Sequence, residues 1–262
     1  MGLAEHVNQF DPESEVARVE NFIARKQSEI GFKTVIIGLS GGIDSSLTVV
    51  LANRALKNQN IEVVFLPEAT TPDRDSSDVA RLAEKYELDV RKVAIDDLVS
   101  IFKEKLGEIS ELAEANLKAR VRMVILYTLA NRNDGLVLGT GNLSEWLLGY
   151  FTKYGDGAAD LAPLTHLYKT EIKVIARHLD MPESIISKPP SAGLWEDQTD
   201  EEELGGSYEE IDKVLYLKHD KDYTLEEAKE TLDTDTNFVE KIYDMVANSA
   251  HKREGPAVID RK

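Results

Sequence analysis

Short apolar runs alternate with longer amphipathic segments along most of the chain. The runs are rich in Val, Ile and Leu, which is typical of buried strands, whereas the longer segments show helical spacing of their apolar residues. The pattern predicts strands over residues 34–39, 61–66, 88–95 and 135–139. It predicts helices over residues 16–30, 45–57, 72–86, 110–132, 168–179 and 236–250. Such alternation favours an α/β fold with a parallel sheet, right-handed crossovers and helices on its faces.

The last part of the chain, about residues 199–250, is predicted to be helical. Three pairs there have the spacing of a capping box, in which a hydroxyl residue and a Glu three positions later satisfy each other's backbone N–H groups. The pairs are Thr199 with Glu202, Ser207 with Glu210, and Thr224 with Glu227. No linker divides the sequence, so we expect one domain over residues 1–262.

The turn between the first predicted strand and its helix reads GLSGGIDSS, residues 38–46. Gly41 and Gly42 allow backbone N–H groups to approach an anion, and the serines add hydroxyl donors at a positive helix N-terminus. These features predict a phosphate-binding loop.

An acidic residue, Asp44, stands in this loop, where a Walker A sequence would carry a lysine. An acid beside phosphate oxygens requires a cation between them, and Mg²⁺ is the usual one. The alternative is that Asp44 only caps the helix. The whole Ser-Gly-Gly-x-Asp-Ser string favours the phosphate site.

The composition narrows the classes of function. The 262 residues carry a net charge of −17 and include no cysteine. The charge disfavours general binding to nucleic acid or anionic membranes, and the lack of cysteine excludes disulfides, thiolate metal sites and a cysteine nucleophile. No apolar run is long enough to cross a bilayer and no signal peptide is evident, so we expect a cytoplasmic protein without membrane contact.

A second polar turn, residues 140–145, follows the fourth predicted strand. Ligands of open α/β sheets bind at the carboxyl ends of the strands, so this turn and the glycine loop are expected at one edge. Glu145 could bind a metal there. Its spacing from Asn142 is equally that of a helix cap, and the spacing alone does not decide between the two roles.

Three longer blocks extend the pattern, at residues 139–172 (GTGNLSEWLLGYFTKYGDGAADLAPLTHLYKTEI), 188–212 (KPPSAGLWEDQTDEEELGGSYEEID) and 251–253 (HKR). Together with the glycine loop, the chain from about residue 22 onward resembles the ammonia-dependent NAD synthetases, within the N-type ATP pyrophosphatase superfamily. The resemblance implies a Rossmann-like three-layer sandwich of the adenine nucleotide alpha hydrolase type.

The resemblance also implies a reaction. In this family the nicotinate carboxylate of deamido-NAD attacks the α-phosphate of ATP, pyrophosphate leaves, and ammonia then displaces AMP to give NAD. ATP is a co-substrate and Mg²⁺ the expected metal. Donors and Mg²⁺ placed where pyrophosphate departs would stabilise the transition state.

The family's motifs assign roles to individual residues. Asp44 and Lys169 are the expected catalytic residues, and Asp44 and Glu145 the expected metal ligands. Ser191 stands where many relatives have threonine, which keeps the hydroxyl and loses the methyl group. The expected ATP-binding residues are Gly38, Leu39, Ser40, Gly41, Gly42, Ile43, Asp44, Ser45, Thr140, Lys169 and Ser191.

For the dinucleotide, the resemblance implies Arg120, Lys153, Asp160, His251 and Lys252. Cations among them would offset the net negative charge near the substrate. Arg122, on another face of the same helix, could replace Arg120. The alternatives are a helix-surface or interface ion pair for Arg120 and a frayed basic tail for His251 and Lys252.

The family also implies a homodimer with the dinucleotide bound across the interface. The apolar helical stretch 121–130 suits that interface, although a core helix would look the same.

Free ammonia is the expected nitrogen source, and a separate glutaminase partner stays possible. Two other readings are another amidating or thiolating member of the superfamily, which the lack of cysteine disfavours, and a non-catalytic ATP sensor. A sensor would not need Asp44, Glu145, Lys153 and Lys169 together.

Overall fold

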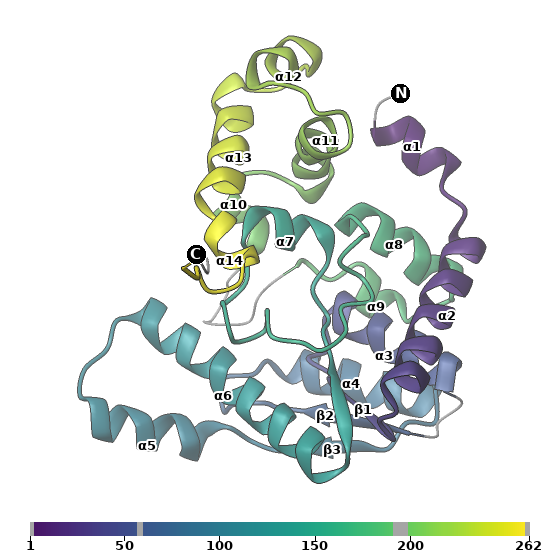
Figure 1. The fold of residues 1–262 in the computed structure, drawn as a ribbon, viewed down its shortest axis with the longest axis vertical. Helices are drawn as coiled ribbons and strands as arrows, with labels where there is room; N and C mark the ends of the chain where they lie inside the picture. Colours follow the sequence, from purple (N-terminus) through teal and green to yellow (C-terminus); the bar gives the residue numbers. More distant parts are fainter. Residues whose placement is uncertain (1–2, 57–59, 191–198, 260–262) are drawn as a thin grey trace.

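A computed structural model describes residues 3–56, 60–190 and 199–259. In this part of the chain four parallel strands form one sheet in the order β3-β2-β1-β4 (Figure 1). The strands are β1 (Thr34–Gly38), β2 (Ile61–Phe65), β3 (Val90–Lys92) and β4 (Gly135–Leu138). The central strand β1 pairs with both β2 and β4, with Val35 opposite Ile61 on one side and Leu136 on the other.

Helices connect the strands and continue beyond them. Those associated with the sheet are α2 (Pro12–Ile30), α3 (Ile43–Leu56), α4 (Asp73–Lys85), α5 (Asp96–Leu106), α6 (Glu111–Arg132), α8 (Lys169–His178) and α9 (Glu183–Ile186). The others are α1 (Leu3–Gln9), α7 (Leu143–Leu148), α10 (Asp200–Leu204), α11 (Tyr208–His219), α12 (Leu225–Thr231), α13 (Thr236–Asn248) and α14 (Ala250–Arg253).

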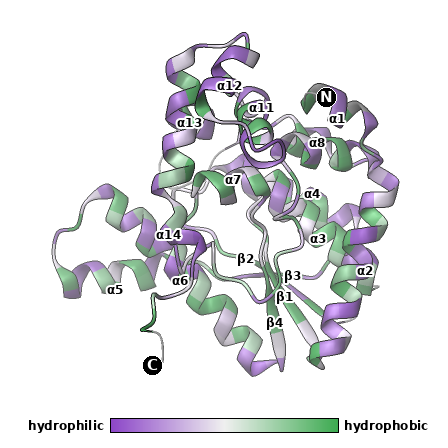
Figure 2. Ribbon diagram, turned by 45° about the horizontal axis from the view of Figure 1, so that its top comes forward, coloured by the Kyte–Doolittle hydropathy of each residue, from purple (hydrophilic) through white to green (hydrophobic). Residues whose placement is uncertain are grey.

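Alternating strand residues build a core on each face of the sheet. In β1, Ile36 packs on one face with Val64 and Val137, and residues of α5 and α6 cover them. Val35 and Ile37 face the other way, into a larger core shared with α2, α3 and α8. Apolar residues therefore dominate β1, β2 and β4 (Figure 2). The sheet lies between two helical layers, which confirms the predicted Rossmann-like three-layer sandwich.

The C-terminal helices form a separate core above the carboxyl edge of the sheet (Figure 1). Tyr208, Ile211 and Leu215 of α11 pack with Val239 and Ile242 of α13, and residues of α1 and α7 join the same cluster with Tyr168, which precedes α8. The prediction of a helical segment over residues 199–250 agrees with these elements. Helix α7 thus lies between the sheet edge and the C-terminal helices.

The caps agree with the sequence in most details. Ser207 and Thr224 form reciprocal capping boxes with Glu210 and Glu227, and the Thr199 hydroxyl accepts a hydrogen bond from the N–H of Glu202 (3.4 Å).

The third strand is shorter than predicted and is followed by α5, a helix that the pattern did not predict. Among the described residues, β3 is an edge strand that pairs with β2 and with no other strand.

Candidate functional site

The glycine loop lies between β1 and the N-terminus of α3, and its own side chains hold its shape. The Ser45 hydroxyl accepts a hydrogen bond from the Ser40 N–H (3.1 Å) and donates one to the Gly42 carbonyl (3.1 Å). Gly41 has φ +85°, and a Cβ there would lie 2.9 Å from the Asp75 carbonyl oxygen. Glycine is therefore required at this turn. The loop leads into the N-terminus of α3, where backbone N–H groups can bind a phosphate.

Asp44, in the first turn of α3, joins the glycine loop to the turn after β4. Its Oδ1 accepts a hydrogen bond from the Asn142 amide (2.9 Å), and its Oδ2 lies 2.5 Å from the Lys169 Nζ. The carboxyl ends of adjacent parallel strands meet at one edge, so β1 and β4 bring the two turns together. The structure thus places Asp44, Lys169 and the 140–145 turn in one group.

Glu145 forms the helix cap that its spacing allowed, and its carboxylate also faces Lys169. With Asn142 it forms a capping box at the start of α7, with Asn142 Oδ1 accepting from the Glu145 N–H (2.9 Å). Its Oε1 also lies 3.2 Å from the Lys169 Nζ. The cap therefore fixes the carboxylate in the position where it meets the same cation as Asp44.

Lys169 carries the positive charge of this group, and its side chain is only 3% exposed. Burial alone would lower the pKa of its ammonium, but Asp44 and Glu145 together raise that pKa well above its usual range. Burial raises the pKa of Glu145 to about 7, and the nearby Lys169 charge opposes the rise. The two carboxylates therefore depend on a cation between them.

The sequence did not predict Lys188, which lies on the other side of the glycine loop. Its Nζ donates a hydrogen bond to the Gly41 carbonyl (3.1 Å) and pairs with Asp75 (2.5 Å) and Asp78 (3.5 Å). The only signal was its place at the start of the KPPS block. This lysine adds a second cation next to the loop.

Two residues of the C-terminal helices also reach the group and were missed. The Tyr208 hydroxyl donates to Asp200 Oδ2 (3.3 Å), and the Lys169 Nζ lies 5.1 Å from the centre of the Tyr208 ring. Both side chains are buried. The α10–α11 corner therefore closes the site from above.

Four of the five residues expected at the dinucleotide gather around the 149–157 segment. The Lys153 carbonyl accepts a hydrogen bond from Arg120 Nη2 (3.2 Å), and the Lys153 Nζ donates to the carbonyls of Glu254 (3.1 Å) and His251. The Lys252 Nζ donates to the Gly149 carbonyl (2.7 Å). These contacts make a second, cationic group, and His251 and Lys252 lie in the short helix α14 and not in the frayed tail that was the alternative.

The fifth residue, Asp160, has different partners. Its Oδ2 accepts from the Val137 N–H (2.7 Å) and its Oδ1 from the Tyr127 hydroxyl (3.3 Å), so it is held at β4. Arg122 donates to the Leu66 carbonyl and pairs with Glu68. Since Arg120 is exposed and Arg122 is not, Arg120 is the more available of the two for a ligand.

Thr140 and Ser191 were also expected to bind ATP. Thr140 is half-buried in the turn after β4, whereas Ser191 lies outside the described residues.

A family model described as NAD synthase matches residues 15–256 of the chain. The chain belongs to the NAD synthase family. This confirms the family expected from the glycine loop and the three sequence blocks.

Relatives in the NAD synthase family match nearly the whole chain. An NH3-dependent NAD(+) synthetase from Archaeoglobus fulgidus is 44% identical, over 94% of this chain and 96% of that protein. The structure of an NMN synthetase from Francisella tularensis has a TM-score of 0.85 at 31% identity, covering 96% of this chain and all of the other. An NH3-dependent NAD synthetase from Campylobacter jejuni, in complex with nitrate, has a TM-score of 0.82 at 29% identity and the same coverage.

The residues of this NAD synthase family member fit a magnesium ion. Asp44 and Glu145 both reach one position that a cation already occupies, the Lys169 Nζ. Mg²⁺ is usually held by one or two carboxylates together with substrate phosphates and water. Within the described ranges no cluster of three or more acidic or histidine side chains could hold a metal ion. Phosphate oxygens would therefore have to complete the coordination.

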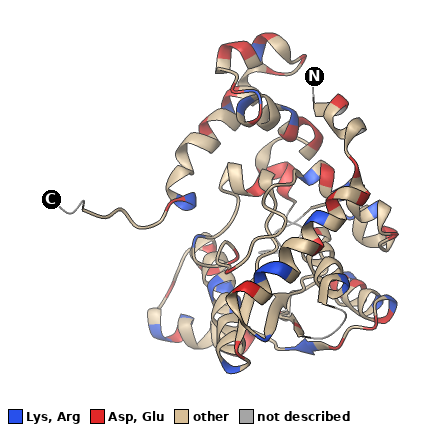
Figure 3. Ribbon diagram, turned by 45° about the vertical axis from the view of Figure 1, so that its right-hand side comes forward, with Lys and Arg blue, Asp and Glu red and all other residues tan. Residues whose placement is uncertain are grey.

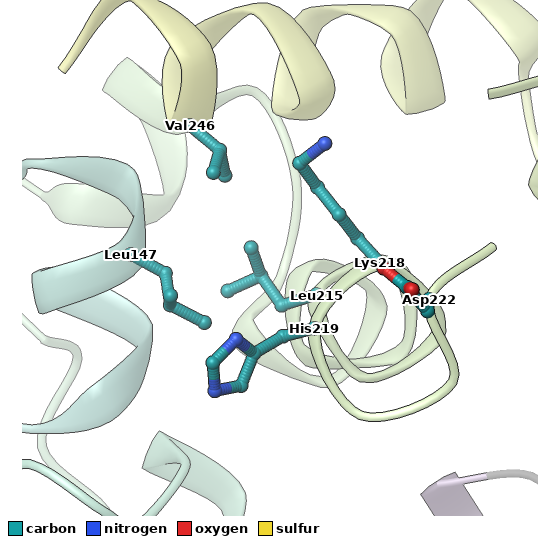
Figure 4. Close-up of a pocket in the computed structure, with 6 residues that line it drawn as sticks. All are labelled: Leu147, Leu215, Lys218, His219, Asp222 and Val246. Carbon is teal, nitrogen blue, oxygen red and sulfur yellow. The ribbon is translucent and has the colours of Figure 1, made fainter. Parts of the chain in front are cut away.

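A cavity of about 200 Å³ lies elsewhere in this NAD synthase fold, between α7, α11 and α13 (Figure 4). Leu147, Leu215 and Val246 form its apolar wall, and the rest of its lining is Lys218, His219 and Asp222. None of the expected substrate or metal residues lines it, so it is not part of the site.

No helix among the described residues combines the length and apolarity that a bilayer crossing requires.

Proposed function

We propose that the chain catalyses the ATP-dependent amidation of deamido-NAD by ammonia, giving NAD, AMP and pyrophosphate. The observation that carries this is the group formed by Asp44, Lys169 and Glu145 at the end of the glycine loop. It combines a phosphate-binding turn with two carboxylates and a buried cation. Family membership supports the same reaction.

In this proposal the backbone N–H groups of the loop and of the first turn of α3 bind the β- and γ-phosphates of ATP. Mg²⁺, held by Asp44 and Glu145, would neutralise phosphate charge as pyrophosphate departs. When ATP and Mg²⁺ bind, before the chemical steps, Lys169 would exchange its carboxylate partners for phosphate oxygens. Lys188 contacts the Gly41 carbonyl, so it holds the loop from the side facing α4.

The chemistry follows from the substrates. A carboxylate oxygen of the nicotinate attacks the α-phosphorus, and the bond to the β-phosphate bridging oxygen breaks. Ammonia then attacks the carbonyl carbon of the mixed anhydride, AMP leaves with that carboxylate oxygen, and the nitrogen loses one proton to solvent to give the amide. Both steps build negative charge on phosphate, and the proposed cations stabilise it without reorganising at that moment.

The cationic group around residues 149–157 supplies the dinucleotide site in this proposal. The protein carries a net charge of −17, with acidic residues along helices in many parts of the fold (Figure 3). Arg120, Lys153 and Lys252 provide the local positive charge that an anionic substrate needs, and His251 lies beside them. Asp160 would meet a neutral polar group of the substrate.

A second candidate substrate is the corresponding mononucleotide. The similarity to an NMN synthetase, with a TM-score of 0.85, favours testing it. The same glycine loop and acid–lysine group would activate a nicotinate carboxylate on either molecule. The difference would lie in the pocket that accepts or omits the second nucleotide.

The proposal is tested by supplying ATP, Mg²⁺ and ammonium with deamido-NAD or with nicotinate mononucleotide in parallel. We expect NAD from the first, with a higher kcat/KM than for the mononucleotide. Preference for the mononucleotide would support the second candidate, and no amidation of either would refute both. Efficient replacement of ammonium by glutamine in the purified protein would contradict ammonia as the nitrogen source.

We also propose that the protein is a homodimer that pairs through α5 and α6. Figure 1 shows α5 and the first turns of α6 projecting from the body of the fold. Large apolar side chains on this hairpin are exposed, namely Leu98, Ile101, Phe102, Leu106, Leu112 and Val124. Such a concentration marks an interaction surface. In the stretch 121–130, Val121, Leu129 and Ala130 are buried in the monomer, so only its exposed positions are free for a partner.

Ile101→Asp is expected to convert the dimer to a monomer, because each of the two subunits would bury one added carboxylate in the interface. Mass measured by light scattering checks this. The control is Ile30→Asp, which adds the same charge at an exposed isoleucine of α2 and should leave the dimer intact. A wild-type monomer, or an Ile101→Asp dimer as stable as wild type, would contradict the proposed interface.

A further inference from the structure

The helices that carry Glu145 and Lys169 begin next to each other. Leu143, the first residue of α7, donates its N–H to the Leu167 carbonyl (2.8 Å), just before α8 begins at Lys169. The distance between Glu145 and Lys169 therefore depends on how these two helix starts are held together.

In helix α8 the side chain of the N-cap residue does not bond to the first N–H groups of the helix. Its N-cap residue is Tyr168, whose hydroxyl bonds to Asp220 instead of to a helix N–H. The first N–H groups of a helix have no partner within the helix and must find one elsewhere. Two side chains from other helices supply them.

Ser144 and Asp212 are those two residues. The Ser144 hydroxyl accepts from the Lys169 N–H (2.9 Å) and donates to Asp212 Oδ1 (2.5 Å). Asp212 Oδ2 accepts from the Thr170 N–H (2.9 Å). Ser144 precedes Glu145 and Thr170 follows Lys169, so the carboxylate holds the neighbours of both site residues.

Asp212 comes from α11 in the C-terminal helices and its side chain is fully buried. Burying a carboxylate is costly unless hydrogen bonds satisfy it, and the positive end of a helix favours its charge. A structural cap would need only the bond to Thr170. The additional bond to Ser144 links this cap to α7 and thus to Glu145.

From this geometry we propose that Asp212 is a positioning residue, which acts through Ser144 and Thr170 to fix Glu145 relative to Lys169. The inference rests on the proposed function, because it treats that pair as the phosphate and metal group. It gives the C-terminal helices a defined part in the site besides closing it.

Asp212→Asn and Ser144→Ala test the proposal. Both are expected to lower kcat/KM for ATP by about 10- to 100-fold, because small displacements of site groups have effects of this size. Both should also reduce the rise in Tm that ATP with Mg²⁺ produces. The double variant should be little worse than Asp212→Asn alone, since the two residues act in one chain of bonds.

Glu171→Gln is the matched control. Glu171 is also buried at the start of α8, where its Oε2 accepts from the Tyr168 N–H (2.8 Å). In the hydrogen bonds of the described residues its side chain does not pair with Ser144 or Thr170. We expect a comparable loss of Tm, with kcat/KM and the ligand-induced rise in Tm within about twofold of wild type.

If Asp212→Asn and Ser144→Ala lose Tm and keep wild-type kinetics and ligand response, Asp212 is only structural and the inference is wrong. If wild-type protein makes no NAD, the proposed function fails. The ATP-induced change in Tm then decides the positioning role by itself.

Discussion

Asp44→Asn is expected to lower kcat for NAD formation by at least about a hundredfold while the protein stays folded. The substitution keeps the size of the side chain and removes the charge that faces Lys169 at 2.5 Å. Without that charge, Glu145 is the one carboxylate of the pair left to bind the proposed Mg²⁺. Initial rates with saturating ATP and Mg²⁺, with circular dichroism as a check on folding, measure the effect.

A matched control is Asp96→Asn. Asp96 is also in the first turn of a helix, α5, and its Oδ1 accepts a hydrogen bond from the Ala69 N–H (2.7 Å). Asp96→Asn is expected to retain activity within about twofold, since the hydrogen bond of Asp96 is to Ala69 and not to a residue of the glycine loop. Substantial Mg²⁺-dependent turnover by Asp44→Asn would remove Asp44 from the mechanism.

Lys169→Met is expected to abolish most activity and also to make stability depend on Mg²⁺. The buried ammonium holds Asp44 and Glu145, which are 16% and 19% exposed, so its loss leaves two facing carboxylates without a countercharge. Breaking such a buried pair costs about 3 kcal/mol, which corresponds to a fall in Tm of roughly 6–12 °C. Mg²⁺ binding to the freed carboxylates should restore much of this loss.

The control for this effect is internal. In the double variant Asp44→Asn with Lys169→Met, one carboxylate is gone, and the rise in Tm with Mg²⁺ should largely disappear. Thermal unfolding with Mg²⁺ or with a monovalent salt at equal ionic strength separates binding from screening. If Lys169→Met shows no Mg²⁺ response beyond that of wild type, the carboxylate pair is not a metal site.

Much of the fold and the central group could be predicted because the signals are local. The spacing of apolar residues predicted the parallel sheet and the helices on its two faces. In such a sheet the carboxyl ends of β1 and β4 lie at one edge, which brings Asp44 close to the 140–145 turn. Glu145 illustrates how a helix cap can place a side chain in the site. The cap orients its carboxylate, and the carboxylate meets the cation.

The unpredicted features depend on contacts between distant segments. Lys188 reaches Gly41 from a segment far along the chain, and Asp212 reaches Ser144 from another helix, so neither has a local pattern. Helix α5 was missed for another reason. Its residues Ile101 and Phe102 are exposed in the monomer, so this helix does not present a regular core-facing stripe.

The most direct test of the proposed mechanism follows the carboxylate oxygen. Deamido-NAD labelled with ¹⁸O in its nicotinate carboxylate is incubated with ATP, Mg²⁺ and ammonium, and the products are measured by mass spectrometry. The mechanism predicts NAD, AMP and pyrophosphate in equal amounts, with one ¹⁸O in the phosphate of AMP. Formation of ADP, or AMP without the label, would contradict activation of the carboxylate at the α-phosphate.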